Sequence, residues 1–142
     1  MLVDSNGLKF IEANEGFCAT PKPDNKGLQW GYGHDQQPGE DPPVSITPEQ
    51  AEALLVEDLV TRFEPAVQHL IPSSATQNQI NACIDFCYNE GPRNFATLLS
   101  HGWDQVPLQM PRWCWAEVDG IMQELPGLQS RRAKEVTLFN TL

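Results

Sequence analysis

Two carboxyl side chains near the start of the chain, Glu15 and Asp24, stand nine residues apart and are followed by a glycine-rich turn. Glu15 precedes Gly16, and the turn has the sequence Gly31-Tyr32-Gly33-His34. Two carboxyl groups on either side of one bond can protonate a leaving oxygen and activate a water molecule. This is the chemistry by which glycosidic bonds are hydrolysed.

The segment before Glu15 has the pattern of a short amphipathic helix. Ser5 or Asn6 can cap a helix that runs to about residue 14, and the glycine after Glu15 is a typical terminator. Leu8, Ile11 and Glu15 are spaced so that they share one face of that helix. Burial and the negative end of the helix dipole should both raise the pKa of Glu15, as a general acid requires. An ordinary surface glutamate is the alternative for this residue taken alone.

The ordered set of motifs resembles the phage-type lysozymes, the muramidase endolysins of glycoside hydrolase family 24. Their signature is a helix ending in Glu-Gly, an Asp nine residues on, and a hairpin carrying Thr-x-Gly-x-Gly-His. The corresponding segments here are Glu15-Gly16-Phe17, Asp24 and Gln29-Trp30-Gly31-Tyr32-Gly33-His34. The resemblance continues through Phe86-Cys87-Tyr88-Asn89-Glu90-Gly91, Asn94-Phe95, Leu125-Pro126-Gly127-Leu128 and Arg131-Arg132-Ala133, so that it covers nearly the whole chain.

The resemblance implies an α+β fold that is mostly α, with a small N-terminal β-hairpin, a helical C-terminal lobe and a cleft between two lobes. We expect one domain over residues 1–142. Its small lobe would span about 14–46, a connecting helix about 47–64, and the helical lobe about 65–142 together with the first helix. Thr47-Pro48-Glu49-Gln50 and Thr76-Gln77-Asn78-Gln79 are capping-box sequences that begin two of the helices. Pro65 should stop or kink the first of these.

The resemblance also assigns roles. Glu15 would be the general acid, and Asp24 would polarise a water on the opposite face of the sugar, with inversion at the anomeric carbon. In the family a Thr helps Asp24 to hold that water, but here Gln29 occupies the Thr position and the loop is one residue shorter. A Gln amide can also bond a water, and Thr20 is a nearby hydroxyl that could substitute.

Trp30, Tyr32, His34 and Asn89 are the candidates for contacts with the saccharide. Most aromatic residues of a small domain belong to its core, although Trp30 in the hairpin could face a sugar. His34 has no second His or Cys at metal-ligand spacing, so we expect no metal and no cofactor, and a structural bond to a neighbouring carboxylate is the stronger alternative. Asn89 could equally serve the end of its helix.

Three functions remain open. A muramidase would hydrolyse the β-1,4 bond between N-acetylmuramic acid and N-acetylglucosamine of peptidoglycan, for bacterial cell lysis. A lytic transglycosylase would need the acid but no held water, which the loss of the family Thr keeps possible. A non-catalytic peptidoglycan-binding module of the same fold would need neither. Product mass separates the first two, and insensitivity to Glu15→Gln would identify the third.

Composition limits the partners. The formal net charge is −10, with 19 acidic against 9 basic side chains, and argues against nucleic acid. No segment is apolar enough to insert into a membrane, and the N-terminus lacks the pattern of a signal peptide. We expect a monomer made in the host cytoplasm and brought to the cell wall by a holin, lysis or secretion machinery. Reduced cysteines are expected, with Cys83 and Cys87 on the apolar face of a helix and no pairing assigned to Cys18 or Cys114.

Overall fold

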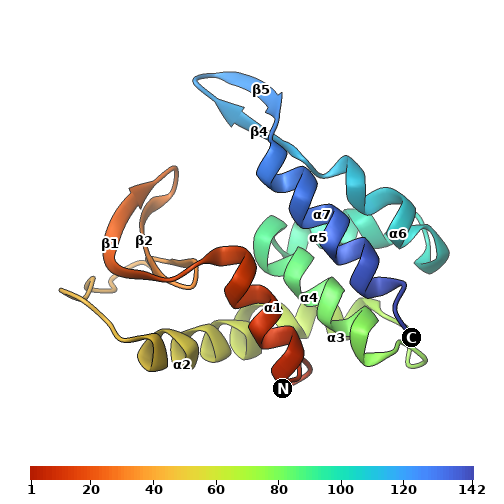
Figure 1. The fold of residues 1–142 in the computed structure, drawn as a ribbon, viewed down its shortest axis with the longest axis horizontal. Helices are drawn as coiled ribbons and strands as arrows, with labels where there is room; N and C mark the ends of the chain where they lie inside the picture. Colours follow the sequence, from red (N-terminus) through yellow and green to blue (C-terminus); the bar gives the residue numbers. More distant parts are fainter.

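The chain folds into a small antiparallel sheet and a helical body, joined by a long helix (Figure 1). The computed structural model describes all of residues 1–142. The first part comprises α1 (Ser5–Glu15), β1 (Cys18–Asp24), β2 (Gly27–Gly31) and β3 (His34–Asp35). The three strands pair in the order β1-β2-β3, each antiparallel to its neighbour. This confirms the predicted lysozyme-like α+β fold with a small N-terminal hairpin.

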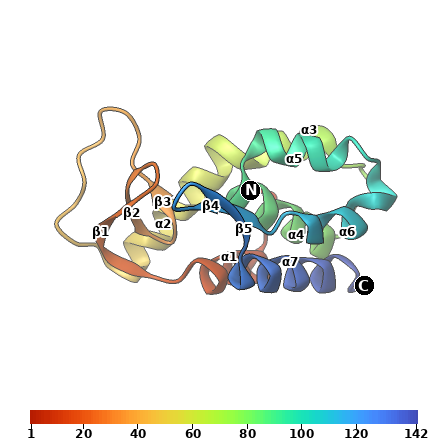
Figure 2. The same cartoon turned by 90° about the horizontal axis from the view of Figure 1, so that it is seen from above.

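The remainder of the chain is mostly helical. Its elements are α2 (Pro48–Asp58), η1 (Leu59–Phe63), α3 (Glu64–Leu70), α4 (Gln77–Glu90), α5 (Pro92–Leu99), η2 (Trp103–Gln105), α6 (Val106–Gln109), η3 (Met110–Arg112), β4 (Trp115–Val118), β5 (Ile121–Glu124) and α7 (Pro126–Phe139). α2 connects the sheet with the helical body, and the loop before α2 extends away from the rest of the molecule (Figure 2). None of the helices combines the length and apolarity that a membrane span requires.

Local capping explains where several helices begin and end. The Thr47 and Thr76 side chains accept hydrogen bonds from the N–H groups of Gln50 and Gln79, so both predicted capping boxes are confirmed. The prediction for α1 was wrong at its start, because Asp4 caps the helix by accepting a bond of 2.9 Å from the N–H of Gly7.

Pro65 does not end the helical path. The chain passes from α2 into one turn of π-helix, η1, and continues as α3 with the proline in the first turn. A wider turn leaves room for the ring and needs no N–H from proline, so the helical path continues.

α4 is the central helix of the body, and α1, α3, α5 and α7 pack around it (Figure 1). Its buried residues include Ile84 and Phe86, and Cys83 and Cys87 lie in the core as predicted. All four cysteines are free. Burial raises the pKa of Cys87 to about 12, so this thiol stays protonated at neutral pH.

The antiparallel hairpin of β4 and β5 was not predicted. The chain forms the short helical elements η2, α6 and η3 around Pro107 and Pro111 before it turns into the hairpin. The strands are four residues each, and Asp119 and Gly120 at the turn both have positive φ. Their alternation of apolar and polar residues is weak, since both strands are largely solvent-exposed.

Candidate active site

A cavity of about 210 Å³ lies between the end of α1, the first sheet and the end of α4. It brings together four of the residues that the sequence singles out, Glu15, Asp24, Gln29 and Asn89. The other residues that line it are Asn25, Lys26, Gly33, Asp35 and Tyr88. Polar and ionisable groups dominate this set, so the cavity is suited to a hydrophilic ligand and to proton transfer.

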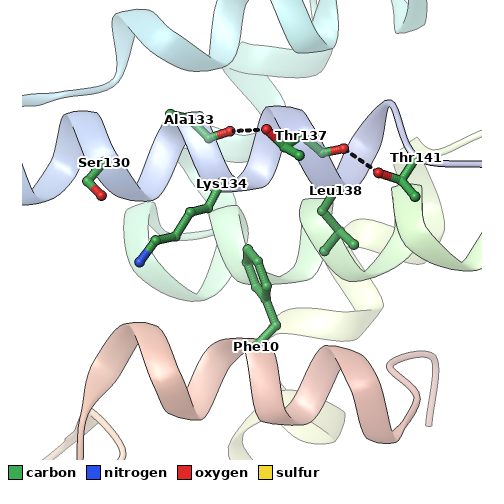
Figure 3. Close-up of a pocket in the computed structure, with 7 residues that line it drawn as sticks. All are labelled: Phe10, Ser130, Ala133, Lys134, Thr137, Leu138 and Thr141. Carbon is green, nitrogen blue, oxygen red and sulfur yellow. Dashed lines mark hydrogen bonds between the residues drawn. The ribbon is translucent and has the colours of Figure 1, made fainter.

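The two largest grooves elsewhere lack this chemistry. One of about 460 Å³ runs between α1 and α7 and is lined by Phe10, Lys134 and Leu138 with small and hydroxyl side chains (Figure 3). Another, of about 600 Å³, passes the beginning of α7. Neither has a carboxyl group among its lining residues, so neither can supply the acid and base of a hydrolytic site.

Glu15 is the last residue of α1, and its side chain is only 14% exposed. Gly16 ends the helix with φ of 74°, a conformation that glycine adopts without strain. Arg131 of α7 donates a hydrogen bond of 2.7 Å to Glu15 Oε1. Burial raises the pKa of Glu15, the charge and hydrogen bond of Arg131 lower it, and the net shift is upward. The carboxyl group therefore keeps its proton to higher pH than an exposed glutamate.

Gly33 allows the sheet to approach this carboxyl group. Its φ is +80°, and a Cβ added there would lie 2.5 Å from Glu15 Oε2. A side chain at this position would collide with Glu15, so the glycine of the turn has a steric role as well as a conformational one.

Arg131 is shared between Glu15 and a second carboxylate. Its Nε and Nη2 donate to the two oxygens of Asp85, at 3.0 and 2.8 Å. Burial alone would raise the pKa of Asp85, but bonds from Glu135 and the charge of Arg131 hold it below its usual range. Because Asp85 is fully buried and ionised, it neutralises Arg131 and limits how strongly the guanidinium can draw the proton from Glu15.

A second buried arginine orients the amide of Asn89. Arg132 Nη2 donates to Asn89 Oδ1 and to Glu135 Oε1, both at 2.7 Å, and its Nη1 donates to Glu90 Oε1 at 2.9 Å. Burial and the nearby Asp85 raise the pKa of Glu135 well above its usual value. Since Arg132 occupies the amide oxygen, Asn89 points its N–H groups elsewhere as donors.

The opposite side of the cavity is the first sheet. Asp24 Oδ1 accepts a bond of 2.7 Å from the N–H of Lys26, which closes the turn between β1 and β2. Gln29 of β2 lies directly opposite Asp35 of β3. Burial raises the pKa of Asp35, Lys26 at 3.6 Å lowers it, a hydrogen bond with Asp24 raises it, and the net shift is upward.

Trp30 and His34 do not line the cavity. Trp30 is 2% exposed and His34 is 3% exposed, and their rings lie 4.9 Å apart on the core side of the sheet. His34 Nδ1 is 2.6 Å from Asp58 Oδ2, and Nε2 is 2.8 Å from Glu40 Oε1. The structure therefore gives neither residue a surface for a saccharide, and His34 has the bonds to carboxylates that its alternative role requires.

Tyr32 and Thr20 also lie outside the cavity lining. The Tyr32 ring packs 5.6 Å from that of Phe17, and its carbonyl oxygen accepts a bond of 2.6 Å from the Tyr88 hydroxyl. Tyr32 thus contacts the site through its backbone, and it positions Tyr88. Thr20 stands exposed on β1, where its carbonyl oxygen accepts from the Cys18 thiol.

Sequence reasoning missed Asp35, Asp85 and the buried arginines. Arg131 and Arg132 entered the sequence analysis only as part of the resemblance, and in the structure both are buried and paired. A signal for Asp35 was present, since it follows His34 in a strand and must point to the opposite face. No comparable local signal existed for Asp85, whose partner Arg131 is 46 residues away.

Glu15 is a buried carboxyl group at a helix end, and it lines one cavity with the acidic residues of the sheet. This site and the mostly helical α+β fold are those of a lysozyme-like protein. The sequence profile of the phage lysozyme family matches residues 12–135. The chain therefore belongs to the phage lysozyme family.

Known proteins resemble the chain in both sequence and structure. It is 33% identical to an endolysin of Bacillus phage PZA over 99% of its length, and it spans 56% of that relative. It is 31% identical to an endolysin of Acyrthosiphon pisum secondary endosymbiont phage 1, with 99% of each chain covered. The muramidase domain of SpmX from Asticaccaulis excentricus superposes with a TM-score of 0.82 at 30% identity, covering 99% of this chain and 98% of that domain.

Proposed function

We propose that this protein is a muramidase that hydrolyses the β-1,4 bond between N-acetylmuramic acid and N-acetylglucosamine in peptidoglycan. The observation that carries the proposal is the meeting of Glu15 with the carboxyl groups of the sheet in one polar cavity. Membership of the phage lysozyme family supports it, as do relatives that are endolysins and a structural neighbour that is a muramidase domain.

Glu15 would serve as the general acid. Its raised pKa keeps the proton on Glu15 to higher pH than on an exposed glutamate, and Arg131 donates a hydrogen bond to one of its oxygens. As the glycosidic bond breaks, Glu15 transfers its proton to the leaving oxygen. The ionised Glu15 that results is stabilised by the same guanidinium, so Arg131 favours the product of the proton transfer.

Asp24 and Gln29 would hold the attacking water on the opposite side of the sugar. A carboxylate accepts the proton of the water while the oxygen bonds to the anomeric carbon, which inverts its configuration. The Gln29 amide can donate to that water or accept from it. Asn89, whose oxygen is engaged by Arg132, would donate its N–H groups to the saccharide.

Hydrolysis is favoured over the two alternatives by the sheet side of the cavity. A lytic transglycosylase needs no base for water, yet Asp24 and Asp35 both line this cavity. A binding module needs no acid with a raised pKa, yet Glu15 is buried beside a neutralised arginine. The mass of the released fragments distinguishes them, because hydrolysis adds water and transglycosylation leaves an anhydro end.

We further propose that the protein acts on the bacterial cell wall as a monomer, after release by a holin, lysis or secretion. Sedimentation velocity at several concentrations tests the oligomeric state. A sedimentation coefficient that rises with concentration would contradict the monomer.

The test of the activity is turbidity loss of bacteria with a permeabilised outer membrane, measured with wild type, Glu15→Gln and the matched control Glu57→Gln. Glu57 is an exposed glutamate of α2. Wild type and Glu57→Gln should clear the suspension, and folded Glu15→Gln should lose clearing by a factor of about 10²–10⁴. Equal clearing by Glu15→Gln would exclude its role as the acid. No clearing by folded wild type on any wall type would favour the binding module.

A further inference from the structure

Asp35 lines the same cavity as Glu15, Asp24 and Gln29. It is the second residue of β3, and it lies directly opposite Gln29 in the antiparallel pair. Residues directly opposite each other in such a pair project from the same face of the sheet. Side chains alternate along a strand, so His34 points into the core while Asp35 points into the cavity.

Asp35 and Asp24 form a pair of carboxyl groups. Both side chains line the same cavity, and the neighbouring Asp24 contributes to the upward shift in the pKa of Asp35. A neighbouring carboxylate disfavours ionisation, so Asp24 makes Asp35 accept a proton more readily and hold its own negative charge less readily. Lys26 Nζ, 3.6 Å from Asp35 Oδ2, stabilises that negative charge.

Asp24 and Asp35 differ in solvent exposure and in their hydrogen bonds. Asp24 stands exposed at the end of β1, and one of its oxygens is fixed by the N–H of Lys26 at 2.7 Å. Asp35 is more enclosed, with 27% of its side chain exposed. The charge of Asp35 also reaches across the cavity, where it contributes to the raised pKa of Glu15.

The cavity has no free hydroxyl group to hold a water molecule. Tyr88 carries the only hydroxyl among the lining residues, and it donates to the Tyr32 carbonyl oxygen at 2.6 Å. Gln29, at the position where the resemblance expects a Thr, lies beside Asp35. An additional carboxylate next to Gln29 can supply the acceptor that the missing hydroxyl would have supplied.

We propose that Asp35 is a second catalytic carboxylate, which together with Asp24 forms a single base for the attacking water. This rests on the proposed muramidase function. The pair accepts one proton from the water as the water oxygen bonds to the anomeric carbon. The bond from that carbon to the glycosidic oxygen breaks, and Glu15 gives its proton to the leaving oxygen. One water is consumed. Afterwards the Asp24–Asp35 pair releases its extra proton to solvent and Glu15 takes one up from solvent, so the enzyme returns to its starting state.

The experiment compares Asp35→Asn, Asp24→Asn, the double variant and the control Asp41→Asn, using soluble dye-labelled peptidoglycan. Asp41 lies in the exposed loop before α2 and outside the cavity. We expect Asp35→Asn to lower kcat by about 10²–10⁴-fold with little change in KM and thermal stability. The double variant should lose little more than the stronger single variant, because residues that act as a unit are non-additive. Asp41→Asn should match wild type.

Two further variants separate catalysis from structure. Asp35→Ala removes the carboxyl group and leaves space, so added azide or formate should restore part of its activity if Asp35 contacts the water. Lys26→Met removes the ion pair but keeps the carboxyl group. If Lys26→Met reproduces the whole loss of Asp35→Asn, the residue acts only through that pair, and the proposal is overturned.

The outcomes also distinguish this proposal from the muramidase itself. An inactive wild type would overturn the function. An active wild type with Asp35→Asn reduced by less than about threefold, far below the range for a general base, would overturn the role of Asp35 alone. If Asp35→Asn does not fold, the test is whether azide or formate restores activity to Asp35→Ala. A folded Asp35→Ala whose activity neither anion restores would contradict the proposal.

Discussion

The wall of the cavity that carries Glu15 is built from helices, whereas the opposite wall is a short antiparallel sheet. We call them the helical wall (Glu15, Tyr88 and Asn89, backed by Arg131 and Arg132) and the sheet wall (Asp24, Lys26, Gln29 and Asp35). In the helical wall Glu15 is largely enclosed and bonded to Arg131, and the two buried arginines each donate several hydrogen bonds. In the sheet wall they are exposed or half-buried, and their one ion pair is long at 3.6 Å.

The comparison shows two ways to set the protonation of a carboxyl group. Glu15 owes its raised pKa chiefly to burial, opposed by an arginine that Asp85 already neutralises. Burial also contributes most to the raised pKa of Asp35, but here an exposed lysine lowers the pKa and a second carboxyl group adds to the upward shift. Burial resists screening by salt, whereas exposed charges are screened. The acid should therefore keep its pKa across salt concentrations better than the base.

The largest expected effect comes from breaking the helical wall with Asp85→Asn. Removing the charge of one partner from a buried pair costs about 3–5 kcal/mol of unfolding free energy. Urea unfolding measures this loss, with the exposed Asp104→Asn as control. Arg131 would then act more strongly on Glu15 and lower its pKa, so the basic limb of the pH–activity profile should move to lower pH. A loss below about 1 kcal/mol would show that the pair is dispensable.

His34→Asn tests how the sheet wall is anchored. Burial lowers the pKa of His34, the bonds to Asp58 and Glu40 raise it, and the net shift is upward. Charged hydrogen bonds of this kind contribute about 1.5–3 kcal/mol each when intact. Because the folded pKa lies above the unfolded value of about 6.5, this stability is fully present below that pH and is lost as pH rises through the folded pKa.

Unfolding free energies of wild type and His34→Asn should therefore differ most near about pH 5.5 and converge in alkaline solution. Equal differences at both ends of the range would contradict a charged His34.

Gly33→Ala probes the point where the two walls meet. Gly33 and Gly39 have φ of +80° and +79°, but only Gly33 has Glu15 within reach of an added Cβ. Both substitutions should cost about 1–2 kcal/mol of stability, since alanine is strained in this conformation. Only Gly33→Ala should also lower turnover, by about 10²-fold, because it displaces the acid. Similar activity losses for the two variants would argue against contact between Gly33 and Glu15.

The smallest effect is expected for Lys26→Gln in the sheet wall. Lys26 is 76% exposed, and an exposed ion pair contributes at most about 1 kcal/mol. Since Lys26 lowers the pKa of Asp35, its removal should raise that pKa and move the acidic limb of the pH–activity profile to higher pH. High salt should produce part of the same shift in wild type. An unchanged acidic limb in the variant would mean that Lys26 does not act on the base.

The helix boundaries show how much of the fold local sequence could predict. The capping boxes at Thr47 and Thr76 depend on side chains three residues apart, and both were predicted. The β4–β5 hairpin was missed because its strands are short and solvent-exposed, which leaves little hydrophobic alternation. Pro65 was predicted to stop or kink its helix, and the chain instead continues through the π-helical turn η1 into α3.

The sequence by itself determined the residues near one another in the chain: Glu15 at a helix end, the glycine turn, and the family to which the chain belongs. Only the tertiary structure decided which groups surround them. Arg131 reaches Glu15 across 116 residues and Asp85 across 46, separations at which no local pattern predicts contact. The pairing of β2 with β3 turned Trp30 and His34 inward and Asp35 toward the cavity. The pKa of a carboxyl group depends on burial and neighbouring charge, and both exist only once the chain has folded.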